Sequence, residues 1–209
     1  HPRFCSVAAG DVTGDGYPDL YFGDYDSSGF GGSGEPAGVD FNNKFLINQG
    51  ASNPGFFTDT MASRISASKL LSAFGAASVI ADMNNDGAID IVKQTSLSAP
   101  THVAIHHNNP GNVGFFPDAT YKNVDTAAPY FVSTGDLNND SRLDLVVTHH
   151  GIDKYYLNTR NGGQGAANFQ AFSFGAPSSG FGSQSVAADL NNDGWNDVLI
   201  SDVDVDIPD

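Results

Sequence analysis

Four short acidic loops recur along the chain and constrain its fold more than any other feature. Aspartate stands at the first, fifth and ninth position of every copy, and glycine stands at the sixth position of three. The last two intervals between copies are nearly equal, which indicates a repeat architecture. The copies are DVTGDGYPD (11–19, loop 1), DMNNDGAID (82–90, loop 2), DLNNDSRLD (136–144, loop 3) and DLNNDGWND (189–197, loop 4).

Each loop lies between two segments that have the composition of β-strands. Small and β-branched residues precede the loops at 4–10, 76–81, 130–135 and 183–188, and apolar runs follow them at 20–25, 91–95, 145–150 and 198–203. A third strand is predicted at 43–50, 102–111 and 154–162, and a fourth at 55–60, 114–120 and 168–174. No segment has a sustained helical period; the nearest, 62–74, is short and Ser-rich.

Four strands in a repeat of about 50 residues predict an all-β β-propeller of four-stranded antiparallel blades. The chain is expected to be a single partial propeller, 1–209, with about 3.5 blades at approximately 1–74, 75–128, 129–178 and 179–209. The first blade is longest because it contains a Gly/Ser-rich insertion, 26–38, predicted to be a surface loop. Since half a propeller exposes sheet edges and a core face, the remaining strands are expected from outside this chain or from a second chain.

Alternate side chains of a curled loop converge on one point, and hard oxygen donors around a point predict a Ca²⁺ site. Glycine at the sixth position suits a sharp turn, and the seventh residue is expected to offer its backbone carbonyl. The loops differ from an EF-hand because strands flank them and no Glu stands at a twelfth position. The predicted ligands are Asp11, Thr13, Asp15, Tyr17 and Asp19 in loop 1; Asp82, Asn84, Asp86, Ala88 and Asp90 in loop 2; Asp136, Asn138, Asp140, Arg142 and Asp144 in loop 3; and Asp189, Asn191, Asp193, Trp195 and Asp197 in loop 4.

The pattern D-x-[DN]-x-D-G-x-x-D before an apolar strand resembles the calcium loop of FG-GAP/VCBS repeats, which occur in integrin α-chain propellers and secreted bacterial proteins. FGAP at 174–177 and FGAA at 74–77 add to the resemblance, which covers essentially the whole chain. It implies a propeller, often seven-bladed, with up to four Ca²⁺ ions here at one rim. Two residues depart from the pattern: Thr13 at the third position weakens loop 1 as a ligand set, and Ser141 at the sixth position strains loop 3.

The charge balance limits the partners. There are 24 acidic residues against 9 basic ones, a net charge of −15, which disfavours nucleic acid and anionic membranes. No apolar run approaches the ~20 residues of a membrane span. Half of the acidic residues are the loop aspartates, which repel one another unless a cation binds. Because weak calcium sites fill where free Ca²⁺ is millimolar, the sequence favours a secreted, cell-surface or periplasmic protein.

Histidine pairs and one cysteine are further candidates for chemistry. His106 and His107, like His149 and His150, are adjacent and therefore point to opposite faces of a strand, so neither pair chelates a metal as a pair. One histidine from each pair meeting across neighbouring blades is one possibility, and ordinary blade-edge histidines are the other. The lone Cys5 is interpreted as a small buried hydrophobe, with a partner outside this stretch as the alternative.

Other carboxylates give weaker signals. Asp202, Asp204 and Asp206 alternate along one strand, which fits either a cation or partner face or a solvated edge. No G-x-S-x-G, H-E-x-x-H or phosphate-binding glycine loop is present. Spacing singles out none of the spare carboxylates, which are Asp24, Asp26, Asp59 and Asp118.

The sequence therefore predicts a calcium-stabilised extracellular propeller that binds or assembles with a protein or glycan partner. One alternative is the propeller domain of a polysaccharide lyase or sugar dehydratase, since similar repeats form such propellers. Another is a structural subunit of a filament or larger complex. The sequence favours a binding module over an enzyme only weakly, because a fold by itself does not determine function.

Overall fold

The computed structural model describes residues 4–24, 42–70, 74–96, 102–127, 129–160, 165–175 and 181–203. Within these ranges the chain forms three four-stranded antiparallel sheets and one two-stranded sheet. In each four-stranded sheet the strands pair in sequence order, so every sheet is a meander. This confirms the all-β fold of propeller-like blades, with the last blade represented by two strands.

The predicted first and second strands fall close to the observed ones. Blade 1 contains β1 (Phe4–Gly10), β2 (Asp19–Asp24), β3 (Lys44–Asn48) and β4 (Phe57–Asp59); blade 2 contains β5 (Ser78–Ala81), β6 (Asp90–Thr95), β7 (His102–His106) and β8 (Lys122–Asp125); blade 3 contains β9 (Pro129–Gly135), β10 (Asp144–His149), β11 (Lys154–Asn158) and β12 (Phe169–Ser173); and blade 4 contains β13 (Phe181–Ala188) and β14 (Asp197–Val203).

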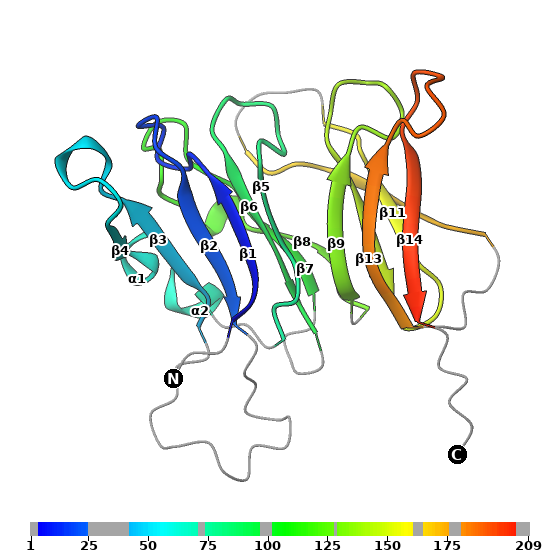
Figure 1. The fold of residues 1–209 in the computed structure, drawn as a ribbon, viewed down its shortest axis with the longest axis horizontal. Helices are drawn as coiled ribbons and strands as arrows, with labels where there is room; N and C mark the ends of the chain where they lie inside the picture. The colour runs from blue at the N-terminus through cyan, green and yellow to red at the C-terminus, as the bar shows by residue number, and fades with distance from the viewer. Residues whose placement is uncertain are drawn as a thin grey trace, which may run out of the picture.

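The blades stand side by side, with the hairpin loops between their first and second strands along one edge (Figure 1). The first strands of neighbouring blades are in contact, β1 with β5, β5 with β9 and β9 with β13. Apolar cores fill the blade 1–blade 2 and blade 2–blade 3 junctions. The blade 1–blade 2 core includes Tyr21, Phe45 and Ile91, and the blade 2–blade 3 core includes Val92 and Leu145. Each junction therefore buries one face of each blade against its neighbour.

The fourth strand of blade 2 was predicted wrongly at 114–120. The observed strand is β8, and the predicted segment holds turns and a 3-10 helix, η2 (Asp118–Thr120). The physical reason is a tertiary contact: the Phe116 amide donates to the Arg64 carbonyl at 3.1 Å, and the Phe116 ring is buried in the blade 1–blade 2 core. Burial of this ring fixes the segment against blade 1, where the ring also packs on His106 of β7, instead of leaving the segment free to pair as a strand.

Short helices occupy part of the segment that was predicted to lack a sustained helix. They are α1 (Met61–Arg64) and α2 (Ala67–Leu70), each of one turn, and they follow β4; the remaining short helix is η1 (Gly50–Ser52). Met61 and Leu70 are buried in the blade 1–blade 2 core. These helices are therefore stabilised by packing, since isolated turns of this length do not persist in water.

Some predictions fall outside the described residues. These are the 26–38 insertion, Asp26, Asp204, Asp206 and the end of the FGAP segment. Among the described helices, none has the length and apolar character to span a membrane.

Candidate metal centres

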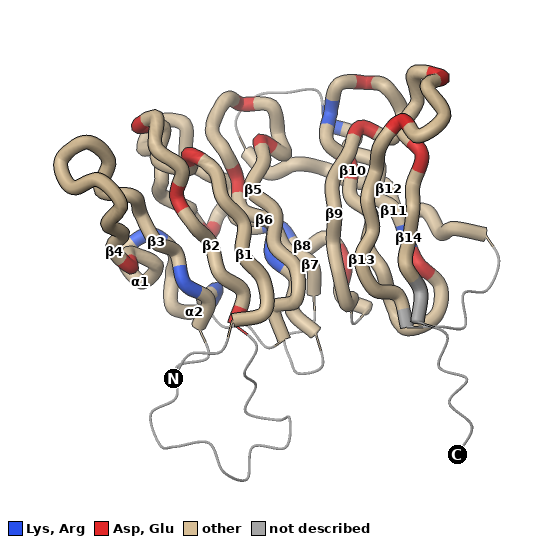
Figure 2. The backbone as a smooth tube through the Cα atoms, viewed as in Figure 1, with Lys and Arg blue, Asp and Glu red and all other residues tan. Residues whose placement is uncertain are grey.

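The four acidic loops lie at equivalent places in the fold. Loop 1 joins β1 to β2, loop 2 joins β5 to β6, loop 3 joins β9 to β10, and loop 4 joins β13 to β14. The acidic residues of these loops collect along one edge of the molecule (Figure 2). The arrangement of the blades thus places all four loops on one rim, although loops 1 and 4 are more than 170 positions apart in sequence.

Two left-handed residues curl each loop. The fourth position has a positive φ in all four loops, 72° at Gly14, 55° at Asn85, 56° at Asn139 and 61° at Asn192. The sixth position does too, with φ between 86° and 88° at the glycines and 64° at Ser141. Gly and Asn are the residues that adopt this conformation most readily. Ser141 does so at a cost, as predicted from its departure from glycine.

The curl turns the first and fifth aspartates inward in the same way in every loop. In loop 2 the Asp82 carboxylate accepts hydrogen bonds from the amides of Asp86 (3.2 Å) and Gly87 (2.9 Å), while Asp86 accepts one from the Ala88 amide (3.0 Å). The corresponding bonds recur in loops 1, 3 and 4. The loops therefore have one common backbone geometry.

The ninth aspartate anchors the loop to the third strand of its own blade. In loop 2 the buried Asp90 carboxylate accepts from the Met83 amide at 2.8 Å and from the Asn108 amide at 2.8 Å. Asp19 and Asp144 make the same pair of bonds in blades 1 and 3. Asp197 bonds the Leu190 amide at 3.1 Å. This aspartate therefore has a structural role whether or not a metal binds.

The carboxylates of a loop act on one another electrostatically. Burial raises the pKa of Asp90 to about 8, and repulsion from the nearby Asp82 and Asp86 carboxylates adds to the rise. Burial likewise raises the pKa of Asp144, with Asp140 and Asp136 contributing. Burial also raises the pKa of Asp19. The first, fifth and ninth aspartates thus share one neighbourhood, where a bound cation would relieve their repulsion.

The side chains alone do not form a ready-made cage. Among the described residues, no group of three or more His, Cys, Asp or Glu side chains could hold a metal as it stands. The reason is that the carboxylates face backbone amides, and the Asn84 amide group donates to Asp86 at 2.9 Å. The donor set still fits a hard cation, because it combines carboxylate, amide and backbone carbonyl oxygens.

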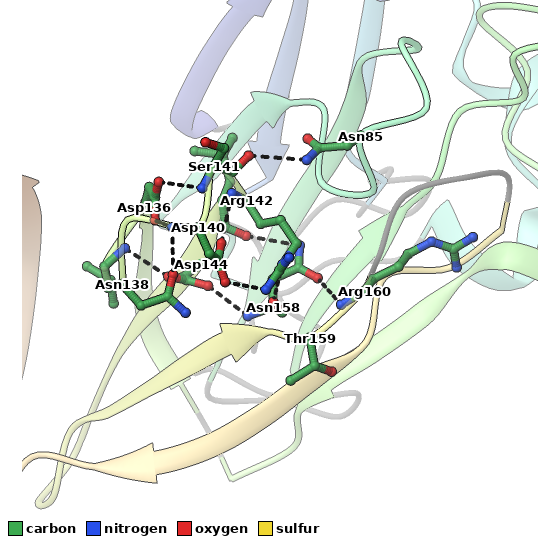
Figure 3. A network of polar contacts seen from close by, with 12 residues as sticks. Asn85, Asp136, Asn138, Asp140, Ser141, Arg142, Asp144, Asn158, Thr159 and Arg160 are labelled. Carbon is green, nitrogen blue, oxygen red and sulfur yellow. Dashed lines mark hydrogen bonds and ion pairs between the residues drawn. The ribbon is translucent and has the colours of Figure 1, made fainter.

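Loops 1 and 3 differ from loops 2 and 4. In loop 1 the Thr13 hydroxyl donates to Asp19 at 3.2 Å, so it is engaged within the loop. In loop 3 the Arg142 guanidinium pairs with Asp140 and also donates to the Asn158 carbonyl at 2.7 Å (Figure 3). Arg142 therefore supplies loop 3 with a cation of its own.

Asparagines that the sequence analysis did not single out join each loop to the preceding one. Asn108, which follows β7, donates to the carbonyls of Val12 in loop 1 and Ile89 in loop 2, both at 2.8 Å. Asn158, at the end of β11, does the same for Met83 (2.7 Å) and Leu143 (3.2 Å). The sequence contained a signal for these residues, because an Asn stands just before the turn that follows the third strand of blades 1, 2 and 3.

The fourth position forms a second set of links. Asn85 of loop 2 donates to the Ser141 carbonyl of loop 3 at 3.2 Å, and Asn139 of loop 3 donates to the Gly194 carbonyl of loop 4 at 2.7 Å. The loops are thus hydrogen-bonded in series along the rim.

The repeating unit of the chain is a hairpin of two strands joined by an acidic loop. A family model also detects this unit. The model of the FG-GAP-like repeat matches residues 82–147 and 136–200. The chain belongs to the FG-GAP-like repeat family. The matched residues include loops 2, 3 and 4. Repeats of this family are typical of extracellular proteins. A comparison with curated proteins gives no match.

The histidines of this FG-GAP repeat protein are not brought together. His106 is buried beside the Phe116 and Tyr121 rings, and burial lowers its pKa well below the ordinary value. His107 accepts from the Ala167 amide at 3.0 Å through Nε2, so Nδ1 donates to the Thr120 carbonyl at 2.7 Å. His150 is exposed. His106 and His107 are packed in the interior, and the described residues include no group of three or more His, Cys, Asp or Glu side chains that could hold a metal ion.

His149 belongs to a buried network at the other end of the blades. Its Nε2 lies 2.8 Å from the Asp125 carboxylate, which Tyr156 also contacts and Lys154 approaches to 3.6 Å. Burial opposes ionisation of Asp125, but hydrogen bonds from His149, Tyr156 and the Ala127 amide lower its pKa well below the ordinary value. This network joins β8 of blade 2 to β10 and β11 of blade 3.

The remaining candidates are structural or exposed. Cys5 is exposed at the start of β1, so its prediction as a buried hydrophobe was wrong. Asp24 is buried, Asp59 lies 3.6 Å from Lys44, and Asp118 accepts from Ser66 at 2.7 Å.

Proposed function

We propose that this chain is a calcium-stabilised extracellular propeller module that binds or assembles with protein or glycan partners. The observation that supports calcium most directly is the gathering of the first, fifth and ninth aspartates in one curled loop, where burial raises the pKa of Asp90 and repulsion from Asp82 and Asp86 adds to the rise. A divalent ion bound among them would remove that repulsion. The hydrogen-bonded series of loops would then hold the blades in register.

The ligands proposed for each ion are the first, third and fifth side chains and the seventh carbonyl, with the ninth carboxylate nearby. When bound, the ion supplies neutralising charge and cross-links the loop. At a free concentration of about 100 Kd, one site contributes roughly 2.7 kcal/mol of stability. Loops 2 and 4 are expected to bind most tightly, loop 1 less tightly because of Thr13, and loop 3 least because of Arg142.

Two features support an extracellular binding role. Sites of weak affinity, about 10⁻⁴–10⁻³ M, fill only where calcium is millimolar, as it is outside cells. The seventh position also presents exposed aromatic rings on the rim, Tyr17 in loop 1 and Trp195 in loop 4. Such rings supply contact area to protein or sugar partners.

Calcium titration tests the proposal. Thermal melts with 2 mM calcium and with excess EGTA, together with direct ion analysis after desalting, should show a rise in Tm and at least two ions per chain. Asp86→Asn should remove one ion. Asp118→Asn, an exposed carboxylate away from the loops, is the matched control and should change nothing. Identical melts in calcium and EGTA would contradict the proposal.

Partner binding is tested separately with a glycan array and a panel of extracellular proteins, each with and without EGTA. Binding that depends on calcium and is reduced by Trp195→Ala supports the rim as the contact surface. Binding that ignores both changes would place the contact elsewhere.

A further inference from the structure

Asn84, the third residue of loop 2, is held by a residue from outside its own blade. Its side-chain amide donates to the Asp86 carboxylate and to the Gly165 carbonyl, both at 2.9 Å. Gly165 precedes β12 of blade 3, so the second bond crosses the blade 2–blade 3 junction. Asn84 is buried. The proposed third ligand of loop 2 is therefore in direct contact with the next blade.

The blade 3 segment 165–167, named the loop 2 cover below, is fixed by two further hydrogen bonds. The Ala167 amide donates to His107 Nε2 at 3.0 Å, and Ala167 is fully buried. The Arg160 guanidinium donates to the Ala166 carbonyl, and the Arg160 side chain extends away from the aspartates of loop 3 (Figure 3). The loop 2 cover is thus anchored by one side chain of blade 2 and by one of blade 3.

A similar arrangement recurs at the blade 1–blade 2 junction. Gly114 of blade 2 lies against Thr13, the third residue of loop 1, because a Cβ on Gly114 would be 3.2 Å from Thr13 Cγ2. An arginine again holds the segment, since Arg64 donates to the Gly114 carbonyl at 2.8 Å. Gly114 and Gly165 both have a positive φ, 87° and 108°. In both junctions, the connection between the third and fourth strands of one blade therefore lies over the third loop position of the preceding blade.

The chemistry of the third residue decides what this contact can do. In loop 1 the Thr13 methyl group faces the neighbouring segment, and its hydroxyl donates to Asp19. In loop 2 both amide hydrogens of Asn84 are used, so its Oδ1 is turned back into the loop, where it accepts from the Asp86 amide at 3.2 Å. The Gly165 carbonyl therefore orients the oxygen that a hard cation would bind.

We propose that the loop 2 cover is a positioning element for calcium in loop 2. The Gly165 carbonyl holds Asn84 Oδ1 towards the loop, so that ion binding in loop 2 and docking of residues 165–167 on blade 2 stabilise each other. This inference rests on the proposed calcium site and adds the neighbouring blade to it. Because coupling between two binding events is reciprocal, the ion strengthens docking of the cover by the same factor by which the cover strengthens ion binding.

Amide hydrogen exchange and chemical shifts, measured by NMR in calcium chloride and in EGTA, test the coupling. The Gly87 amide bonds the first aspartate of loop 2, so its chemical shift follows ion binding there. The exchange rate of the Ala167 amide follows docking of the cover. We expect calcium to shift Gly87 and to slow exchange at Ala167 about tenfold. Asp86→Asn should abolish both effects, whereas Asp193→Asn, the same change in loop 4, should leave both intact.

Substitutions at the third loop position give a second test. Asn191 of loop 4 makes the same bond to its fifth aspartate, at 3.0 Å, but among the described residues it bonds no other blade. Asn191→Asp adds a carboxylate to the ligands and should strengthen calcium binding in loop 4, measured from the Gly194 shift. Asn84→Asp places a carboxylate against the Gly165 carbonyl and should weaken calcium binding in loop 2 about tenfold.

A variant outside the loop keeps the test valid if Asn84→Asp disturbs folding. Arg160→Gln removes one anchor of the cover, so it should weaken calcium binding in loop 2 and leave binding in loop 4 unchanged. A calcium shift at Gly87 without slower exchange at Ala167 would overturn the coupling and leave the calcium proposal intact. Equal responses to Asn84→Asp and Asn191→Asp would do the same. No calcium shift at Gly87 would instead contradict the calcium site of loop 2, and the coupling with it.

Discussion

The pKa values of buried carboxylates are shifted in opposite directions at the two ends of the blades. At the loop end, Asp90 accepts hydrogen bonds from neutral amides and lies near two other aspartates, and its pKa is raised. At the opposite end, Asp125 is approached by His149 and Lys154, and its pKa is lowered. Both carboxylates are almost fully buried. Burial raises the pKa of both carboxylates; at Asp125 hydrogen bonds from His149, Tyr156 and the Ala127 amide outweigh burial, whereas at Asp90 the two amide hydrogen bonds do not.

This contrast shows where the chain supplies its own cations. The Asp125 network joins blades 2 and 3 through groups of the protein itself, although His149 Nδ1 is buried without a hydrogen-bond partner among the described residues. Loop 2 has no such partner among the described residues, whereas loop 3 has Arg142. The rim is therefore where an external cation has most to contribute, and the following predictions test that distinction.

The largest effect is expected at Asp125. Asp125→Ala leaves His149 and the Tyr156 hydroxyl buried without their acceptor, so it should lower the free energy of unfolding by about 3–5 kcal/mol. Urea unfolding in calcium and in EGTA measures the loss, which should be equal in both. Asp118→Ala should cost under about 0.5 kcal/mol. If Asp125→Ala lowered the free energy of unfolding only in calcium, the Asp125 network would depend on the metal, and the two ends would not differ as described.

The pH dependence should have opposite signs at the two ends. The raised pKa of Asp90 gives stability that is fully present below its unfolded value of about 3.9 and is lost as pH rises towards about 8. The lowered pKa of Asp125 gives stability that is present above about 3.9 and is lost as pH falls further. Calcium favours ionised aspartate, so the stabilisation by calcium should grow from pH 4 to pH 8, by on the order of 3 kcal/mol.

Thermal melts at half-unit pH steps, with calcium or EGTA, measure this growth. Asp90→Asn cannot titrate at that position and should flatten the EGTA profile. Asp144→Asn, the equivalent change in loop 3, is the comparison. An EGTA profile that rises from pH 4 to pH 8 in the unaltered chain would show that the pKa values of the ninth aspartates are not raised as described.

A smaller effect is expected when the internal cation of loop 3 is removed. Arg142→Gln takes a positive charge away from Asp140, so calcium should stabilise this variant by about 1 kcal/mol more than it stabilises the original chain. Ion analysis should show additional calcium bound. Lys44→Gln removes a charge elsewhere in the molecule and should leave calcium binding unchanged. If Arg142→Gln binds no more calcium, the difference between loops 2 and 3 has another cause.

The smallest effect concerns backbone strain at the sixth position. Ser141→Gly should stabilise the protein by about 0.5–1 kcal/mol, because a non-glycine residue there has a φ of 64°. Gly87→Ala in loop 2 is the matched reverse change and should destabilise by a similar amount. A Cβ at Gly87 meets no atom within 4 Å, so its cost comes from the backbone alone. Equal stability of both variants would argue against strain.

Much of the fold was predictable because its signals are local. Strand composition, turn residues and the recurring loops predicted the approximate positions of all but one of the observed strands. The observed sheets confirm the all-β assignment. The exception, β8, shows the limit. Residues 55–60 and 114–120 both contain Gly-Phe-Phe, yet only the first contains a strand. Burial of Phe116 against blade 1, a contact across blades, decided the second.

The candidate site was predictable only in part. Aspartate and asparagine at alternate positions indicate a hard-oxygen site by their chemistry. The hydrogen-bond partners of the ninth aspartate could not be predicted from sequence spacing, because the spacing differs in each blade. Asp19, Asp90 and Asp144 accept from asparagine amides that are 29, 18 and 14 residues further along the chain. Insertions between strands change these separations, whereas the spatial contact stays the same.

The sequence by itself determined the repeat, the strand order within each blade and the acidic rim, because these depend on neighbours close along the chain. Only the tertiary structure decided which carboxylates meet a cation of their own and which face amides and other carboxylates. The reason is that strands from two blades must pack before His149 reaches Asp125, or before Asn158 reaches loop 2. Electrostatic environment is therefore a property of the assembled blades.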